Sequence, residues 1–249
     1  MAMDPLKQFT VKPVVELSVL GQDVSLTNST VFMITAVSLC IMFMLLTMGR
    51  GKLVPSRFQS LGEMNYEFVA GMLKDTVGAE GKHYFPFVFC LFMFILFGNL
   101  LGMLPYSFTF TSQIIVTFSL ALMVFFVVTL IGFYKHGLHF LGFFAPKGVP
   151  MILAPILIPI EVISFLVRPV SLSIRLFANM LAGHMVMKLF ASFIVMLGAV
   201  GGIGGILAGS IPFVFSVGLV GFEIFVSCLQ AYIFAILTCV YISDSVHLH

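Results

Sequence analysis

The feature that most constrains this chain is a long stretch without a single charged side chain. Between His83 and Tyr134 there is no Asp, Glu, Lys or Arg. A helix that crosses a lipid bilayer needs about 20 consecutive apolar residues, so this stretch is long enough for two crossings. A turn at Pro105-Tyr106-Ser107 would separate them. The sequence therefore predicts a transmembrane helical hairpin over residues 84–134.

The composition of the chain excludes a soluble globular protein. Of its 249 residues, 60% are hydrophobic and only 9% are charged, whereas a soluble domain typically has about 25% charged residues. The net charge of +2 is too small to indicate nucleic-acid binding. We expect an all-α polytopic membrane protein with a single membrane domain over residues 1–249, no cofactor and no metal. The cysteines lie in apolar runs without paired spacing, which favours buried free thiols over disulfides: Cys40, Cys90, Cys228 and Cys239.

Two further elements are predicted before the hairpin. The uncharged run 31–48 is long enough for one upright span, and Arg50 and Lys52 follow it directly. Because basic residues gather on the cytoplasmic side, residues 1–30 are expected to lie outside. Their polarity is not typical of a cleavable signal or transit peptide. Residues 56–76 place apolar residues at three- and four-residue intervals among charged ones, which predicts an amphipathic helix on the inner membrane surface.

The last part of the chain contains two segments that are too long for upright spans. As helices, residues 150–197 and 206–243 would each be much longer than a hydrocarbon core of about 30 Å. We therefore expect two long helices that are strongly tilted or kinked, with Pro169 and Pro212 as possible kinks. The glycines within 198–205 predict the break between them.

Polar side chains recur along both long segments, although they are costly within a membrane. In the first segment several fall on one face at about 100° per residue: Glu161, Ser164, Arg168, Ser171, Arg175 and Asn179. His184 and Lys188 fall on or near the opposite face. In the second segment one side carries Ser216, Glu223, Ser227 and Gln230, and Asp244 lies at the inner end. Two such helices packed antiparallel predict an aqueous or protonic path inside the protein.

The ionisable residues of this path differ in what they can do with a proton. Glu223 and His184 can exchange protons near neutral pH if burial and proximity tune them. The guanidinium of Arg175 stays protonated, so it cannot relay a proton but can block its passage and attract a carboxylate. These properties suit a gate. The alternative is that Arg175 forms a buried ion pair with Glu161 or Glu223.

Three segments of the chain carry recognisable motifs: SLSIRLFANMLAGH (171–184), FGNLLGMLPYSF (97–108) and LQAYIFAILTCVYISD (229–244). They closely resemble the corresponding segments of subunit a of F-type ATP synthases. The resemblance implies that Arg175 is the family's essential arginine and faces the rotating c-ring. It also implies that Asn179 is the nearby amide and Gln230 the glutamine that faces the arginine from the last helix.

The resemblance further indicates which groups carry the proton. The placement of His184 on the first long segment and of Glu223 on the other resembles the arrangement in mitochondrial and related bacterial members. Asn99 matches a polar position on the first hairpin, and Gly102 stands where some members have an acid. Glu223 and His184 are therefore the main candidates for the outer path. The complete set of expected proton-path residues is Asn99, Glu161, Ser164, Asn179, His184, Glu223 and Gln230.

The function that the resemblance implies is that of a non-catalytic, proton-conducting stator subunit. Two offset half-channels would load and unload a carboxylate on the c-ring, around which the two tilted helices wrap. Arg175 would prevent direct leak and so couple proton flow to rotation and ATP synthesis. The implied partners are the c-ring, the peripheral-stalk b subunits, the F1 head indirectly and the lipid bilayer. Protons are expected rather than sodium ions.

The expected location is the bacterial inner membrane, with the N-terminus outside and the C-terminus cytoplasmic, and the mitochondrial inner membrane is the alternative. Two other protein classes fit the sequence less well. A secondary transporter is disfavoured because such folds usually show internal repeats, and none is visible in this sequence. A purely structural anchor is disfavoured because it would not need Arg175, His184 and Glu223 in apolar segments.

Overall fold

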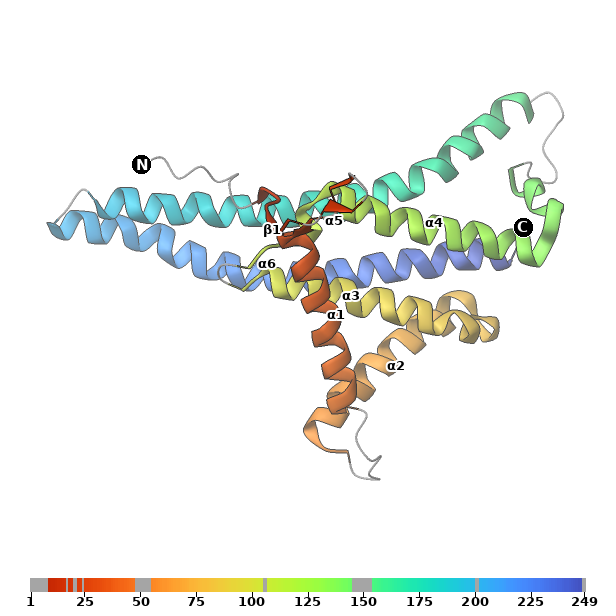
Figure 1. The fold of residues 1–249 in the computed structure, drawn as a ribbon, viewed down its shortest axis with the longest axis horizontal. Coiled ribbons are helices and arrows are strands. Elements are labelled where there is room, and N and C mark those ends of the chain that lie inside the picture. The colour runs from red at the N-terminus through yellow and green to blue at the C-terminus, as the bar shows by residue number, and fades with distance from the viewer. Residues whose placement is uncertain are drawn as a thin grey trace.

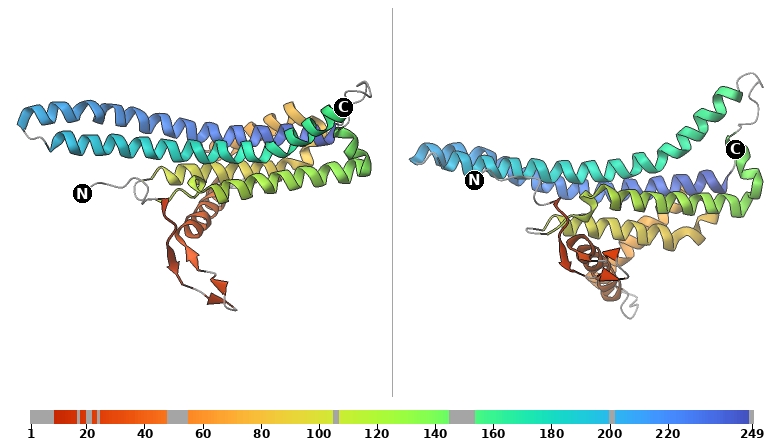
Figure 2. Two further views of the ribbon diagram at one scale, coloured as in Figure 1. Left: turned by 90° about the horizontal axis from the view of Figure 1, so that it is seen from above. Right: turned by 45° about the horizontal axis from the view of Figure 1, so that its top comes forward.

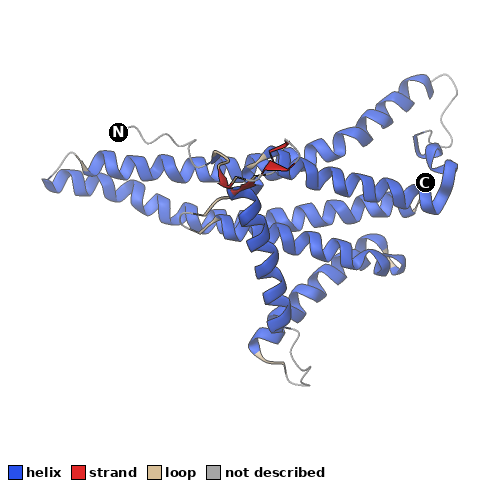
Figure 3. Ribbon diagram, viewed as in Figure 1, coloured by secondary structure: helices blue, strands red, loops and turns tan. Residues whose placement is uncertain are grey.

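Helices make up most of the described residues in the computed structural model (Figure 3). The structure describes residues 9–16, 18–19, 22–23, 25–47, 55–104, 107–144, 154–199 and 202–247. The α-helices are α1 (Asn28–Thr47), α2 (Arg57–Val77), α3 (Phe85–Gly102), α4 (Ile114–His136), α5 (Ala154–Gly198) and α6 (Gly202–Val246). Short 3-10 helices are η2 (Ala79–Tyr84), η3 (Phe110–Ser112) and η4 (Gly137–Phe144).

Among the described residues, five helical segments are long and apolar enough to cross a membrane. They are Asn28–Thr47, Ala79–Gly102, Ile114–His136, Pro155–Gly198 and Leu207–Val246. The expected all-α polytopic fold class is thus confirmed. The predicted turn residues Pro105 and Tyr106 lie outside the described residues, as do the basic residues Arg50 and Lys52.

The amphipathic segment forms α2, which begins one residue later than predicted. Ser56 is its N-cap, and the Ser56 hydroxyl accepts a hydrogen bond from the backbone N–H of Gln59 at 3.3 Å. A serine at this position satisfies one of the backbone donors that a helix start leaves unpaired. Only the second half of α2 is buried in the chain, through Val69, Met72, Leu73 and Val77.

A short antiparallel β ribbon precedes α1 and was not predicted from the sequence. β1 (Pro13–Val15) pairs with β4 (Leu26–Thr27), and β2 (Ser18–Val19) pairs with β3 (Gln22–Asp23). Strands of two or three residues are too short to show the alternation of apolar and polar residues by which strands are recognised.

The two long helices α5 and α6 run antiparallel along the whole length of the molecule (Figure 1). α3 packs chiefly on α6, and α4 packs on α5 and α6, so the long pair holds the two arms of the predicted hairpin together. The joined ends of α5 and α6 project beyond α3 and α4, whereas α1 runs across their direction (Figures 1 and 2). α3, α4, α5 and α6 therefore run at a steep angle to α1.

The long pair differs from the prediction in where the helices break. The first part of α5 diverges from the bundle (Figure 1), and Pro159 and Pro169 inside α5 provide a physical cause for this bend. The predicted glycine break over 198–205 was too wide, because α6 already begins at Gly202. Glycine costs only about 1 kcal/mol relative to alanine in a helix. An unpaired backbone group in lipid costs more, which favours continuing the helix.

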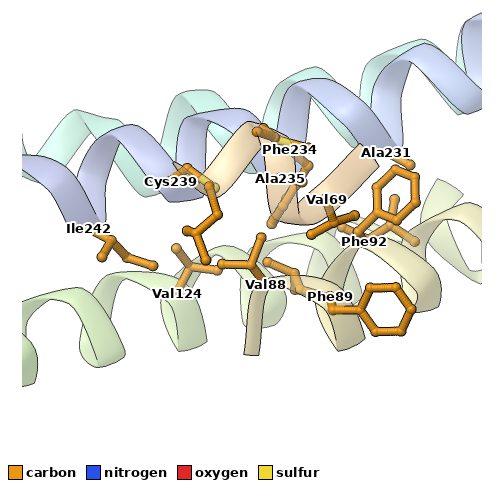
Figure 4. Close-up of a cluster of buried hydrophobic side chains, with 14 of the residues drawn as sticks. Val69, Val88, Phe89, Phe92, Val124, Ala231, Phe234, Ala235, Cys239 and Ile242 are labelled. Atoms are coloured by element: carbon orange, nitrogen blue, oxygen red, sulfur yellow. The ribbon is translucent and has the colours of Figure 1, made fainter. Parts of the chain in front are cut away.

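The apolar core lies where α2, α3, α4, α5 and α6 meet. Figure 4 shows Val69 from α2, Val88 from α3 and Val124 from α4 beside Phe234 and Cys239 of α6. All five side chains are buried. This packing fixes α6 against the rest of the bundle and so positions the polar residues that α6 carries.

The cysteines are free thiols, but the expectation that all four are buried was wrong. Cys239 is buried and Cys40 is partly buried, whereas Cys90 and Cys228 are exposed on the surface of the chain. An apolar run in a membrane protein can face lipid, so an apolar neighbourhood in the sequence does not require burial within the chain.

Candidate functional site

His184 of α5 and Glu223 of α6 lie next to each other between the two long helices. His184 Nε2 is 3.8 Å from Glu223 Oε1. The two residues are only 9% and 6% exposed, and neither carboxylate oxygen of Glu223 has a hydrogen-bond partner among the described residues. The distance is longer than a direct hydrogen bond. A small side-chain rotation would therefore be enough to bring the donor and acceptor of a proton into contact.

The residue before the histidine makes this approach possible. A Cβ atom added to Gly183 would lie 2.5 Å from Glu223 Oε1, well inside van der Waals contact. A glycine on α5 thus leaves the space into which the carboxylate of α6 fits. The pairing of His184 with Glu223 depends on the backbone at position 183 as well as on the two side chains.

Thr109 is a third polar residue at this site, and the sequence reasoning missed it. Its Oγ1 lies 2.9 Å from His184 Nε2 and 3.3 Å from the backbone carbonyl oxygen of Gly102. Thr109 comes from the segment between α3 and α4 and is 5% exposed. Two signals could have pointed to it: its place directly after the FGNLLGMLPYSF segment, and a hydroxyl within a long uncharged stretch.

A cavity of about 810 Å³ reaches the His184 side of this cluster. Its walls come from the N-terminal segment, the start of α1, the end of α3 and the second half of α5. The Phe9 ring packs edge-on against the His184 ring, with 6.4 Å between the ring centroids. The side chain of Gln113 holds Phe9 in place by donating a hydrogen bond to its backbone carbonyl oxygen at 2.8 Å. The lysines Lys12 and Lys188 also line this cavity.

A second polar contact joins α5 and α6 at their other end. Arg168 Nη1 donates to Asp244 Oδ2 at 2.9 Å, and both side chains are partly exposed. The guanidinium carbon lies 5.6 Å from the ring centroid of Phe165 and 5.0 Å from that of Tyr241. Arg168 is thus held by an ion pair and by two aromatic faces.

Arg175 lies between these two polar contacts along α5 and is exposed on the surface of the chain. Among the described residues the ion pairs are Lys135–Glu80, Arg168–Asp244 and His184–Glu223. Arg175 belongs to none of them, so it does not form the alternative ion pair with Glu161 or Glu223. At a rise of 1.5 Å per residue, Arg175 is about 10 Å from Arg168 and about 14 Å from His184 along the helix axis.

Comparison with known proteins decides the family. The family model described as ATP synthase A chain matches residues 30–243. The chain belongs to this family. It is also similar over nearly its whole length to proteins named ATP synthase subunit a. The protein of Chelativorans sp. is 52% identical over 247 residues, which cover 99% of both chains. That of Rhodospirillum rubrum is 51% identical over 245 residues, covering 98% of this chain and 99% of the relative.

A relative from Agrobacterium fabrum, also named ATP synthase subunit a, is 52% identical over 249 residues, which cover 99% of both chains. The resemblance noted in the sequence is thus confirmed at the level of the ATP synthase A chain family. The chain is an all-α, multi-pass membrane member of that family.

The other five predicted proton-path residues lie apart from the His184–Glu223 contact. Asn99 is fully buried between α3 and α6, where its Nδ2 donates to the Ser227 carbonyl oxygen at 3.3 Å and its Oδ1 has no described partner. Gln230 is also buried. Asn179 and Glu161 are half-buried and Ser164 is exposed. No hydrogen bond or ion pair within the described ranges joins any of these five residues to His184 or Glu223.

The sequence predicted that Arg168 and His184 lie on opposite faces of the first long helix. In the structure each of them contacts α6, through Asp244 and Glu223 respectively. The value of 100° per residue assumes a straight helix, whereas α5 bends (Figure 1). Helices that stay in contact over a long distance also wind around each other, and the long arginine side chain reaches further than its backbone position suggests.

The described residues offer no cluster that would suit a metal ion in this member of the ATP synthase A chain family. Nowhere in the described ranges do three or more His, Cys, Asp or Glu side chains come together in that way.

Proposed function

We propose that this chain is the proton-conducting stator subunit of a rotary ATP synthase, without catalytic activity of its own. The observation that carries the proposal is the buried contact of His184 with Glu223 beside a cavity with polar groups in its wall. An imidazole and a carboxyl group are the side chains best suited to exchange protons near neutral pH. In this proposal they pass protons from the cavity to the rotor.

The walls of the cavity support its role as the outer half-channel. With the N-terminus outside, five crossings put the start of α1, the end of α3 and the end of α5 on the outer side. Residues from all three elements, with Phe9 and Thr10 of the N-terminal segment, line the cavity. In this orientation the Arg168–Asp244 contact lies towards the inner side, together with the C-terminus of α6.

The inner half-channel is proposed to begin near the start of α5. Glu161 and Ser164 lie there, one to two turns before Arg168, and are half-buried and exposed respectively. Protons released from the rotor on this side would leave through this polar region. Asn179 and Gln230 are proposed to hold water between the two half-channels without adding a charge.

Arg175 is proposed to separate the two half-channels and to face the c-ring. Its exposure and its absence from the described ion pairs leave the guanidinium available to a carboxylate of another subunit. A protonated, neutral rotor carboxyl can travel through lipid, whereas an ionised one would be costly there. Arg175 attracts the ionised carboxylate, so protons must ride the rotor instead of crossing directly.

This arrangement couples the membrane potential to rotation. Each elementary charge that crosses a potential of 100 mV supplies about 2.3 kcal/mol, so several protons are needed for each ATP. The proposed partners are the c-ring at the exposed faces of α5 and α6, the b subunits of the peripheral stalk, the F1 head through that stalk, and the surrounding lipid. The bacterial inner membrane is the proposed location, since the three relatives compared above are bacterial.

The proposal is tested by replacing Glu223 in the assembled complex. Glu223→Gln keeps the size of the side chain but removes its exchangeable proton, so ATP-driven proton pumping into proteoliposomes should fall at least about 100-fold, as the loss of a proton-transfer group does. Glu63→Gln makes the same chemical change on α2, where Glu63 accepts a hydrogen bond from Gln59 on the exposed face, and should pump at the parent rate. Parent-rate pumping by the Glu223→Gln complex would contradict the proposal.

A further inference from the structure

We propose that Thr109 is a positioning residue of the outer proton path, whose hydroxyl follows the charge of His184. The inference deepens the proposed function and rests on it. Thr109 is the residue that the structure adds to the predicted pair, and it makes the closest polar contact to His184, at 2.9 Å from Nε2. Because the hydroxyl is buried, its hydrogen bonds are stronger than they would be in water.

The hydroxyl of Thr109 has two acceptors within reach for its single proton. One is His184 Nε2 at 2.9 Å, and the other is the Gly102 carbonyl oxygen at 3.3 Å. A hydroxyl group donates one hydrogen bond and can accept two. It can therefore donate to either neighbour by rotation about its C–O bond, and no heavy atom has to move.

The protonation state of His184 Nε2 selects one of these two orientations. When Nε2 carries no proton, Thr109 donates its hydrogen to the ring nitrogen. When Nε2 is protonated, the ring donates to Thr109 Oγ1, and the hydroxyl hydrogen turns to the Gly102 carbonyl oxygen. The ring nitrogen keeps a hydrogen-bond partner in both states, which matters because an unsatisfied buried polar group is costly.

The same contact holds the His184 ring beside Glu223, so that a small rotation of the ring turns its Nε2–H bond from Thr109 toward the carboxylate. Glu223 Oε1 lies 3.8 Å from Nε2, and its oxygens have no hydrogen-bond partner in the described part of the chain. In the transfer step, the Nε2–H bond of the imidazolium breaks and an O–H bond forms on the Glu223 carboxylate. The ring becomes neutral, and Thr109 rotates to donate to the vacated nitrogen. No proton leaves Thr109 in this cycle.

Gly102 makes room for this arrangement. A Cβ atom added to Gly102 would lie 2.6 Å from Thr109 Oγ1 and 2.7 Å from its Cγ2. A side chain at position 102 and the hydroxyl of Thr109 would thus compete for the same space. Gly102 thus provides the space for the Thr109 hydroxyl, and its backbone carbonyl oxygen accepts the hydrogen bond from that hydroxyl.

Paired substitutions at position 109 distinguish a hydrogen-bonding role from a packing role. Thr109→Val keeps the shape and removes the hydroxyl, whereas Thr109→Ser keeps the hydroxyl and removes a methyl group. We expect proton pumping per assembled complex to fall about tenfold or more in Thr109→Val, the scale of a lost hydrogen bond to a charged group, and to stay near the parent rate in Thr109→Ser. A packing role predicts the reverse order, and that result would overturn the inference.

Thr111 provides a matched control two residues away. It is also fully buried, but its hydroxyl has no hydrogen-bond partner among the described residues, so Thr111→Val should pump at the parent rate. A loss in Thr111→Val equal to that in Thr109→Val would overturn the inference. Gly102→Ala gives another route if Thr109→Val fails to assemble. Its added methyl group should displace Thr109 and slow pumping, and parent-rate pumping would count against the inference.

Measuring Glu223→Gln in the same assay distinguishes a failure of this inference from a failure of the proposed function. If Glu223→Gln stops pumping while Thr109→Val pumps at the parent rate, the role of Thr109 is wrong and the proposed function stands. If Glu223→Gln also pumps at the parent rate, the path does not run through this site, and both are wrong. Loss in Glu223→Gln and Thr109→Val together with retention in Thr109→Ser supports both.

Discussion

Two glycines determine how closely the polar groups of the site approach each other. Gly183 leaves space for the carboxylate of Glu223, and Gly102 leaves space for the hydroxyl of Thr109. In both places an added Cβ would come within 2.6 Å of an oxygen atom. At the scale of single residues, the site depends on the lack of a side chain at Gly183 and Gly102 as much as on His184.

Gly183→Ala tests this view of the site. The added methyl group would meet the far end of the Glu223 side chain, which can move, so we expect normal assembly but a Glu223 carboxylate displaced from His184. ATP-driven proton pumping should fall about tenfold or more, the range of effects when a proton-transfer group loses its geometry. Gly71→Ala on α2 has open space around the new methyl group and is the control. Normal pumping by Gly183→Ala complexes would show that the close contact is dispensable.

The sequence was sufficient to single out His184 and Glu223, because ionisable side chains are rare in apolar segments and stand out there. It could not single out Thr109. Hydroxyl groups are common in membrane helices, where they donate to the carbonyl oxygen four residues earlier, as Thr129 and Thr238 do. Only the path of the chain after α3 shows that the Thr109 hydroxyl instead meets a histidine.

At the scale of helices, α5 and α6 are joined by different chemistry at their two polar contacts. Towards the start of α5, Arg168 binds Asp244 and lies over the rings of Phe165 and Tyr241. Further along the pair, the His184–Glu223 contact is 3.8 Å long and buried. The Arg168–Asp244 contact suits a fixed joint, and the His184–Glu223 contact suits groups that change partners.

Because Arg168 contacts two aromatic rings as well as Asp244, we expect substitutions of Arg168 and of Asp244 to lower stability by different amounts. Asp244→Asn removes the ion pair but leaves Arg168 on its aromatic neighbours, at a cost of about 1 kcal/mol for a partly exposed pair. Arg168→Ala removes the ring contacts as well and should cost about 2 kcal/mol. The temperature at which the purified complex loses this subunit should therefore fall further in Arg168→Ala. Equal shifts in the two variants would mean that the aromatic contacts contribute nothing.

The helices themselves were predictable from the sequence. The length of each run without charged residues, and the positions of the basic residues beside it, determine where a chain can cross a bilayer. α1, α2 and α4 lie within a few residues of the prediction or inside the predicted hairpin. The relative rotation of the long helices was not predictable in the same way. Because α5 bends (Figure 1), a straight helical wheel does not show which of its side chains reach α6, and both Arg168 and His184 do.

At the scale of the whole molecule, two polar regions lie at different positions along the antiparallel pair of α5 and α6. They are the Arg168–Asp244 and His184–Glu223 contacts, and Arg175 lies between them on α5. A cavity of about 810 Å³ leads to one region, and the Arg168–Asp244 contact lies in the other. The exposed guanidinium of Arg175 belongs to none of the described ion pairs, so its proposed counterpart is a carboxylate on the rotor.

The central claim is that Arg175 separates two half-channels, and the Arg175→Ala complex tests it most directly. Proton permeability of proteoliposomes and the amount of assembled complex are measured together. We predict normal assembly, no coupled ATP synthesis or pumping, and a passive proton leak, because the fixed positive charge between the half-channels is gone. Arg175→Lys should restore little function, since an ammonium can lose its proton on burial and lacks the planar fork of a guanidinium. Loss of the subunit from the complex, with no leak through what remains, would contradict the claim.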